Sequence, residues 1–141
     1  MTGPLAGGAA CGQNVRMRTI ALEEHFWTAA LAEPPGTGVL ARRGGRQPDE
    51  ALRDLGKARL ADMDAAGIDM QVLSHVQPAA QGLAGPGGVA AARDANDFLA
   101  AAVSRHPDRL AGFATLPTAS PPAAADGCSG RSMTWGSSAG W

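Results

Sequence analysis

The chain has 141 residues, of which 12 are Lys or Arg and 13 are Asp or Glu, so its formal net charge is −1. A chain so nearly neutral lacks the basic surface that nucleic acids and anionic membranes attract, which favours a small molecule or another protein as its partner. No apolar run approaches the roughly 20 residues of a membrane-spanning helix. The two cysteines, Cys11 and Cys128, suggest neither a disulfide framework nor a thiolate metal site. We therefore expect a single cytoplasmic domain with one site at most.

Both ends of the chain and one internal stretch are rich in Gly, Pro or Ser. The first residues lack both the basic start and the continuous apolar core of a signal peptide. A long loop from Trp27 to Pro48 carries Arg42, Arg43 and Arg46, a cluster that more often forms a solvated surface than an anion site. The predicted division of the chain is 1–16, a disordered extension; 17–125, the folded part; and 126–141, an irregular tail.

Strand and helix signals alternate through the folded part. Short apolar runs bounded by turn residues predict strands, and apolar residues at helical spacing predict helices. Asp49 suits the N-cap of the first helix, Gly67 suits its C-cap, and Pro107 prevents the second helix from continuing. This alternation predicts right-handed βαβ units and a parallel sheet. The predicted elements are a strand from Thr19 to Glu24, a helix from Asp49 to Gly67, a strand from Ile68 to His75, a helix from Val89 to Arg105 and a strand from Leu110 to Leu116.

The expected core follows from the same periodicity. Phe98 and Phe113 lie in apolar patterns and are predicted to be buried. After Pro117 the pattern changes, and the stretch from Ala119 to Trp141 shows neither strand nor helix periodicity. The predicted buried faces comprise Leu52, Leu55, Leu60 and Met63 on the first helix, and Ala92, Asn96, Leu99 and Val103 on the second.

The most informative motif is the pair Glu23 and His25 near the end of the first strand. Residues two apart on a strand point to the same face, so a carboxylate and an imidazole would lie together, with Ile20 and Leu22 on the opposite face. This combination suits a divalent metal such as Zn, Mn or Fe. A catalytic zinc site usually has about three protein ligands, so two are too few, and a surface coincidence is the alternative interpretation.

Other polar residues near strand ends carry weaker signals. In parallel βα folds, functional groups gather at the carboxyl ends of strands, so chemistry is also expected at Ser74 and His75. His75 would contact a ligand there, or it is an ordinary loop histidine. Glu24 falls on the face opposite Glu23, toward the edge of the helical layer or solvent. His106 precedes a proline at a helix end, where a cation complements the helix dipole, and is interpreted as structural.

Four segments of the chain, in the same order, resemble the amino-terminal part of the amidohydrolase-2 family. The family includes 2-amino-3-carboxymuconate semialdehyde decarboxylase and the γ-resorcylate and dihydroxybenzoate decarboxylases. The resemblance runs from about Thr19 to Ala125. The segments are Ile20–Phe26 (IALEEHF), Arg59–Ser74 (RLADMDAAGIDMQVLS), Ala92–Ala100 (ARDANDFLA) and Arg105–Ala114 (RHPDRLAGFA).

The resemblance implies a fold, a cofactor and a reaction. The fold is a (β/α)8 TIM barrel of the metal-dependent hydrolase type, with a divalent metal (Zn, Mn or Fe) at the carboxyl ends of its strands. The first-strand metal pair falls on Glu23 and His25, and residues near His75 and Gln81 would border the substrate. The implied reaction is non-oxidative decarboxylation of an aromatic or muconate-type carboxylic acid, and a hydrolase branch shares the same metal site.

The chain also departs from that family. A (β/α)8 barrel needs about 250 residues, whereas this chain supplies three predicted strands and no counterpart of the later metal-ligand histidine or catalytic aspartate. We therefore expect a truncated, inactive copy with an open sheet edge prone to self-association, and a frameshift after about Ala125 would explain the tail. The alternative hypothesis is a non-catalytic small α/β module that pairs its third strand with a partner.

Overall fold

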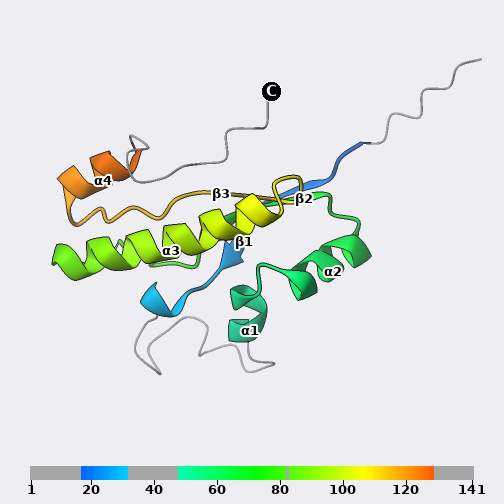
Figure 1. Cartoon of the computed structure of the whole chain (residues 1–141), viewed down its shortest axis with the longest axis horizontal. Helices are drawn as coiled ribbons and strands as arrows, with labels where there is room; N and C mark the ends of the chain where they lie inside the picture. Colours follow the sequence, from blue (N-terminus) through cyan, green and yellow to red (C-terminus); the bar gives the residue numbers. More distant parts are fainter. Residues whose placement is uncertain (1–16, 32–47, 82, 129–141) are drawn as a thin grey trace, which may run out of the picture.

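The structure is a computed structural model that describes residues 17–31, 48–81 and 83–128 (Figure 1). The predicted extension 1–16, the arginine cluster of the long loop and residues 129–141 of the predicted tail lie outside these ranges. Three parallel strands form one sheet in the order β1-β2-β3. The predicted parallel sheet is therefore confirmed.

The strands are β1 (Ile20–Phe26), β2 (Met70–His75) and β3 (Leu110–Gly112). β1 runs past its predicted end at Glu24, so His25 belongs to the strand itself. β3 is shorter than predicted, because its register with β2 covers only the three residues from Leu110 to Gly112. The sheet is therefore short. His25, Ser74 and His75 lie within the last two residues of their strands.

A bulge in β1 overturns the predicted division of its faces. Ala21 aligns with Gln71, but the next aligned pair is Glu24 with Leu73, so β1 holds one extra residue between them. Within the bulge, Glu23 has φ 61°, in the left-handed region. Because the extra residue shifts the alternation, Ile20 and His25 lie on the same side of the sheet, whereas the sequence predicts opposite sides.

The helix predicted from Asp49 to Gly67 is two helices, α1 (Pro48–Arg53) and α2 (Lys57–Ala66). The break lies at Asp54, whose carboxylate accepts hydrogen bonds from the backbone N–H groups of Gly56 at 2.6 Å and Ala58 at 3.1 Å. These bonds satisfy donors at the start of α2 that a continuous helix would have bonded internally. The predicted C-cap is confirmed, because Gly67 has φ 69° and ends α2.

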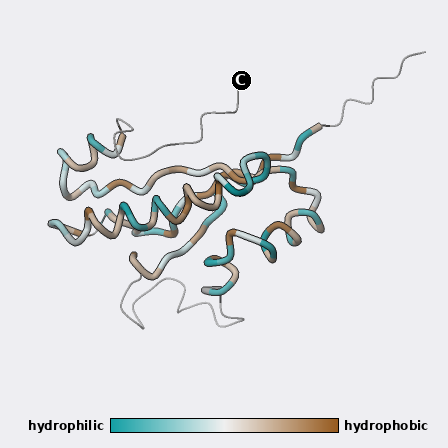
Figure 2. The backbone as a smooth tube through the Cα atoms, viewed as in Figure 1, coloured by the Kyte–Doolittle hydropathy of each residue, from teal (hydrophilic) through white to brown (hydrophobic). Residues whose placement is uncertain are grey.

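The longest helix is α3 (Gly85–Arg105), which starts four residues before its predicted beginning at Val89. Pro86 near its first turn suits the fixed φ of a helix start. The predicted buried face is confirmed for Ala92, Asn96 and Leu99, and Figure 2 shows hydrophobic and hydrophilic residues alternating along the helix. The backbone N–H of His106 ends α3 by bonding to carbonyls of the last turn, so the residue has the structural place predicted for it.

Two short helices lie outside the predicted elements. A 3-10 turn, η1 (Ala29–Leu31), follows β1 and contacts α3. The helix α4 (Pro121–Cys128) lies in the stretch predicted to be irregular, so that prediction was wrong for these residues. Two prolines open α4, and the Ala124 N–H bonds to the Ser120 carbonyl at 3.0 Å. Proline is tolerated in a first turn, where its missing N–H costs no internal hydrogen bond.

The main core lies between the sheet and the helices α2 and α3. It is formed by Phe26, Leu55, Met63, Leu73, Leu99, Ala102 and Leu110, all buried. Two predicted core residues are exposed instead: the exposed fraction is 63% for Phe113 and 39% for Phe98. Phe113 follows the last paired residue of β3, and Phe98 stacks one face of its ring on Phe26 with centroids 6.3 Å apart. Ile20 and Leu22 of β1 are also exposed.

Adjacent glycines in α3 are expected to respond oppositely to a methyl group. A Cβ at Gly88 would collide with the Leu83 carbonyl oxygen and lie 2.8 Å from its carbon, whereas a Cβ at Gly87 meets no described atom within 4 Å. Gly88→Ala should therefore lower the free energy of unfolding by about 1–3 kcal/mol. Gly87→Ala should raise it by roughly 0.5–1 kcal/mol through helix propensity. Urea denaturation followed by circular dichroism measures both, and equal effects would contradict the predicted contact.

Candidate metal site at the carboxyl ends of the strands

The carboxyl ends of β1 and β2 bring four of the predicted site residues to one edge of the sheet. His25 aligns with Ser74, and the next residue, Phe26, aligns with His75. Glu23 and His25 are exposed, whereas Phe26 and His75 are buried. The two histidines at this edge therefore stand on opposite sides of the sheet, one toward solvent and one toward the core.

The imidazole of His25 makes one side-chain contact within the described part of the chain. Its Nδ1 lies 3.0 Å from Oγ of Ser74, the residue directly across the strand pair. The other ring nitrogen, Nε2, has no hydrogen bond to a described residue. The His25 carbonyl accepts a hydrogen bond from Nη2 of Arg59 at 2.9 Å, so both the backbone and the ring of His25 are held by neighbouring elements.

Arg59 is an important residue near this edge whose role the sequence does not indicate. Besides His25, its guanidinium donates to the carbonyls of Asp54 at 2.9 Å and Ala51 at 3.2 Å, and to Gln71 Oε1 at 3.0 Å. Burial lowers the pKa of Arg59 from its ordinary value, and the nearby carboxylates of Glu24, Asp54 and Asp62 partly offset that effect. The residue joins α1, α2, β1 and β2, but an arginine within a helical pattern carries no spacing signal that would identify this role.

Both ring nitrogens of His75 form hydrogen bonds within the chain. Nδ1 lies 2.9 Å from the Val76 carbonyl and must donate to it, while Nε2 accepts the Thr28 N–H at 3.1 Å. The ring also packs edge-on against Phe26, with centroids 5.1 Å apart. These contacts require a neutral imidazole, and burial accordingly lowers the pKa of His75 below its ordinary 6.5.

A half-open hollow of about 180 Å³ lies beside this edge. Both residues predicted to border a substrate, His75 and Gln81, line it, and so does Ser74. The Gln81 side chain is exposed, whereas His75 is buried and has both nitrogens engaged. The remaining lining residues are Gln77, Ala79, Phe113, Ala114, Thr115, Leu116 and Thr118.

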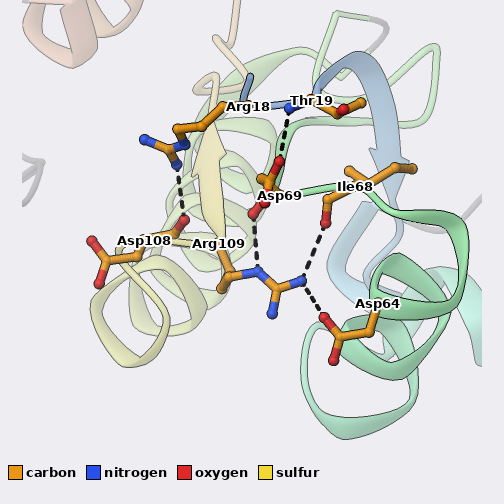
Figure 3. Close-up of polar contacts among 7 residues, drawn as sticks. All are labelled: Arg18, Thr19, Asp64, Ile68, Asp69, Asp108 and Arg109. Carbon is orange, nitrogen blue, oxygen red and sulfur yellow. Dashed lines mark hydrogen bonds and ion pairs between the residues drawn. The ribbon is translucent and has the colours of Figure 1, made fainter. Parts of the chain in front are cut away.

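The opposite, amino-terminal ends of the strands hold a second polar group, the amino-end cluster. Figure 3 shows Arg109 donating to the Asp64 carboxylate at 2.7 Å and to the Asp69 carbonyl at 2.9 Å. The Asp69 carboxylate accepts the Thr19 N–H at 2.8 Å. These contacts tie the strand starts together, as is typical of the stabilising face of βα barrels. The amino-end cluster comprises Arg18, Thr19, Asp64, Ile68, Asp69, Asp108 and Arg109.

Within the described ranges, no group of three or more His, Cys, Asp or Glu residues is arranged to hold a metal ion. Glu23, in the bulge of β1, and His25, next to the last residue of that strand, are a carboxylate and an imidazole on the strand whose carboxyl end would carry the chemistry in a barrel enzyme. Oxygen and nitrogen donors of this kind suit a divalent metal. Their chemistry fits part of a metal site.

The buried state of His75 predicts how stability depends on pH. Because its pKa is lowered in the folded chain, the unfolded chain binds the proton more readily, so the free energy of unfolding should fall as pH decreases below about 6.5. Chemical denaturation between about pH 7.5 and 5.5 measures this slope. His75→Asn should lower stability at neutral pH but flatten the slope, whereas His106→Gln should retain it. An unchanged slope in His75→Asn would contradict the assignment.

No protein-family model matches the chain. It is 38% identical over 111 residues to decarboxylase OrsB of Emericella nidulans, and 38% identical over 107 residues to the γ-resorcylate decarboxylase of Polaromonas sp. strain JS666. Both alignments cover 75% of this chain, but 31% and 32% of the relatives. The chain therefore spans about a third of the length of the curated relatives that it matches.

A solved structure gives the same relationship. Dihydroxybenzoic acid decarboxylase from Polaromonas sp. JS666, determined with bound manganese and the inhibitor 2-nitroresorcinol, is 34% identical with a TM-score of 0.68, over 85% of this chain and 36% of that one. The described strands and helices thus have the fold of part of an amidohydrolase-type TIM barrel. Within the described residues, no helix is long and apolar enough to span a membrane.

Proposed function

We propose that this chain, a homologue of metal-dependent aromatic-acid decarboxylases, carries the first-strand ligands of a divalent metal site, Glu23 and His25. The observation that carries the proposal is their placement on β1, with Glu23 in the bulge, His25 next to the last residue of the strand, and Nε2 of His25 free of hydrogen bonds to described residues. Manganese in the related Polaromonas structure supports a metal of this class. The reaction proposed for the whole protein is decarboxylation of a hydroxylated aromatic acid.

The described residues would have different roles at such a site. When bound, a divalent metal acts as a Lewis acid toward oxygen atoms of a substrate carboxylate. Glu23 and His25 would hold it, and the hollow beside Ser74 would take the substrate ring, with Gln81 offering an amide and Phe113 an apolar face. His75 borders the hollow without moving a proton, because both of its nitrogens are engaged within the chain.

Two ligands do not complete a catalytic centre. Catalytic zinc sites, for example, use about three protein ligands with an open position, and the described residues offer two at this edge. We therefore propose that the present chain binds metal weakly and releases no CO2 from 2,6-dihydroxybenzoate by itself. We refer to Glu23 and His25 together as the metal half-site.

Paramagnetic NMR of the full chain tests the half-site directly. Titrated Mn²⁺ broadens signals near its binding position, even when binding is weak. We expect selective broadening of the backbone signals of Glu23, His25 and Ser74, and loss of that broadening in Glu23→Gln and His25→Gln. The amino-end cluster supplies an internal control, because it lies at the opposite ends of the strands, where the carboxylates of Asp64 and Asp69 are already engaged by Arg109 and Thr19.

Two outcomes would contradict the proposal. Broadening centred on Asp64 and Asp108 would mean that the metal prefers the amino-end carboxylates. No selective broadening, together with concentration-dependent dimers in sedimentation velocity, would favour a module that acts by association through its exposed apolar residues.

A further inference from the structure

The contact between His25 and Ser74 joins two strands at the proposed metal site. The residues are 49 positions apart in the sequence, yet the parallel register places them directly opposite one another. Their side-chain atoms Nδ1 and Oγ are 3.0 Å apart, within hydrogen-bond distance. The contact thus depends on the pairing of β1 with β2, not on a local turn.

A metal-binding imidazole needs a defined tautomer. When one ring nitrogen coordinates the metal, the other carries the proton and donates it to a neighbouring acceptor, which also fixes the plane of the ring. The hydroxyl oxygen of Ser74 has the lone pairs to accept that proton. If Nδ1–H donates to Ser74, the lone pair of Nε2 is left to point away from the strand pair.

We propose that Ser74 is a positioning residue that accepts the Nδ1–H of His25 and so presents Nε2 to the divalent metal. The inference rests on the proposed function of Glu23 and His25. Ser74 would not contact the metal itself. It would act by orienting the imidazole of His25.

The surroundings of the pair support this role. Ser74 is flanked in β2 by Leu73 and His75, whose side chains are buried, so its backbone is held firmly. On the other strand, Arg59 bonds to the carbonyl of His25 at 2.9 Å. With its backbone fixed, the His25 ring has little freedom beyond rotation of the side chain, and Ser74 Oγ selects one orientation.

Metal affinity in matched variants tests the inference. Mn²⁺ binding to the full chain is measured by electron paramagnetic resonance for the wild type, Ser74→Ala, Ser74→Thr and Ser104→Ala. Loss of the acceptor in Ser74→Ala should weaken binding about 10–100-fold, as is typical for partners of metal-binding histidines. Ser74→Thr keeps the hydroxyl and should remain within about threefold of the wild type. Ser104 is an exposed serine on α3, and its variant controls for loss of a hydroxyl elsewhere.

A second readout requires no metal. The ¹⁵N shifts of the His25 ring report which nitrogen carries the proton, and the signal is assigned by its disappearance in His25→Gln. We expect Ser74→Ala to reduce the population protonated at Nδ1 in the neutral ring, and Ser74→Thr to preserve it. A role of Ser74 in folding alone would not change this population while the chain stays folded, as monitored by circular dichroism.

The outcomes separate the inference from the proposed function. If His25→Gln loses Mn²⁺ binding while Ser74→Ala keeps the wild-type affinity, the metal half-site stands and the role of Ser74 is overturned. An unchanged tautomer population in Ser74→Ala overturns it as well. If His25→Gln binds Mn²⁺ as well as the wild type, the proposed function fails, and the inference fails with it.

Discussion

Replacing Asn96 with alanine is expected to lower the free energy of unfolding by about 2–4 kcal/mol, because two buried polar groups would lose their partners. The Asn96 side chain donates Nδ2–H to the Thr115 carbonyl at 3.0 Å and accepts the Thr115 N–H at 2.8 Å. Both residues are buried. These two hydrogen bonds tie α3 to Thr115, which lies three residues beyond the end of β3. Urea denaturation monitored by circular dichroism measures the loss.

Matched variants make the expectation on Asn96 specific. Asp97 is the next residue on α3 and is exposed, so Asp97→Ala should change stability by no more than about 0.5 kcal/mol. Asn96→Asp keeps an acceptor for the Thr115 N–H but loses the donor, and should also destabilise the chain. If Asn96→Ala were as stable as Asp97→Ala, the two hydrogen bonds would contribute nothing measurable.

Arg59→Ala should lower the free energy of unfolding by about 2–3 kcal/mol, since several acceptors lose a charged donor at once. Gln71 Oε1 is the most costly of these, because Gln71 is buried and aligned within the sheet. The same change releases the His25 carbonyl. The backbone amide signals of residues 24–26 should therefore shift, which is a consequence that global destabilisation alone does not produce in the folded spectrum.

A conservative change and a distant arginine serve as controls for Arg59. Arg59→Lys retains the charge but not the planar guanidinium, so it should recover less than half of the lost stability. Arg93, exposed on α3, should tolerate alanine with little effect. Full stability of Arg59→Lys would show that charge matters at this position and the branched hydrogen-bond geometry does not.

Much of the architecture follows from local patterns that can be recognised in the sequence. Gly67 ends α2 in the left-handed conformation, and Ala92, Asn96 and Leu99 are buried at helical spacing, as predicted. The break at Asp54 was missed because Leu52, Leu55, Leu60 and Met63 suggest one continuous stripe. The competing signal was the Asp-x-Gly step, in which an aspartate carboxylate bonds to nearby backbone N–H groups instead of continuing the helix.

The candidate site was predictable in part. The pair Glu23 and His25 stands out because of residue type and position at a strand end, and their role as ligands stays a prediction. The bulge that sets their faces depends on how β1 aligns with β2, which the alternation within one strand cannot reveal. Arg59 and Thr28 act through contacts with residues far away in the sequence, and no local pattern marks such contacts.

The left-handed backbone at Glu23 bears on how this position would evolve. Glycine, and to a lesser extent asparagine, adopts φ near 61° more readily than glutamate does. Selection for folding alone would therefore let position 23 drift toward glycine, whereas selection for a ligand would keep a carboxylate there despite its conformational cost. In a randomised library, the residue that survives at position 23 would thus report which of the two pressures the library had experienced.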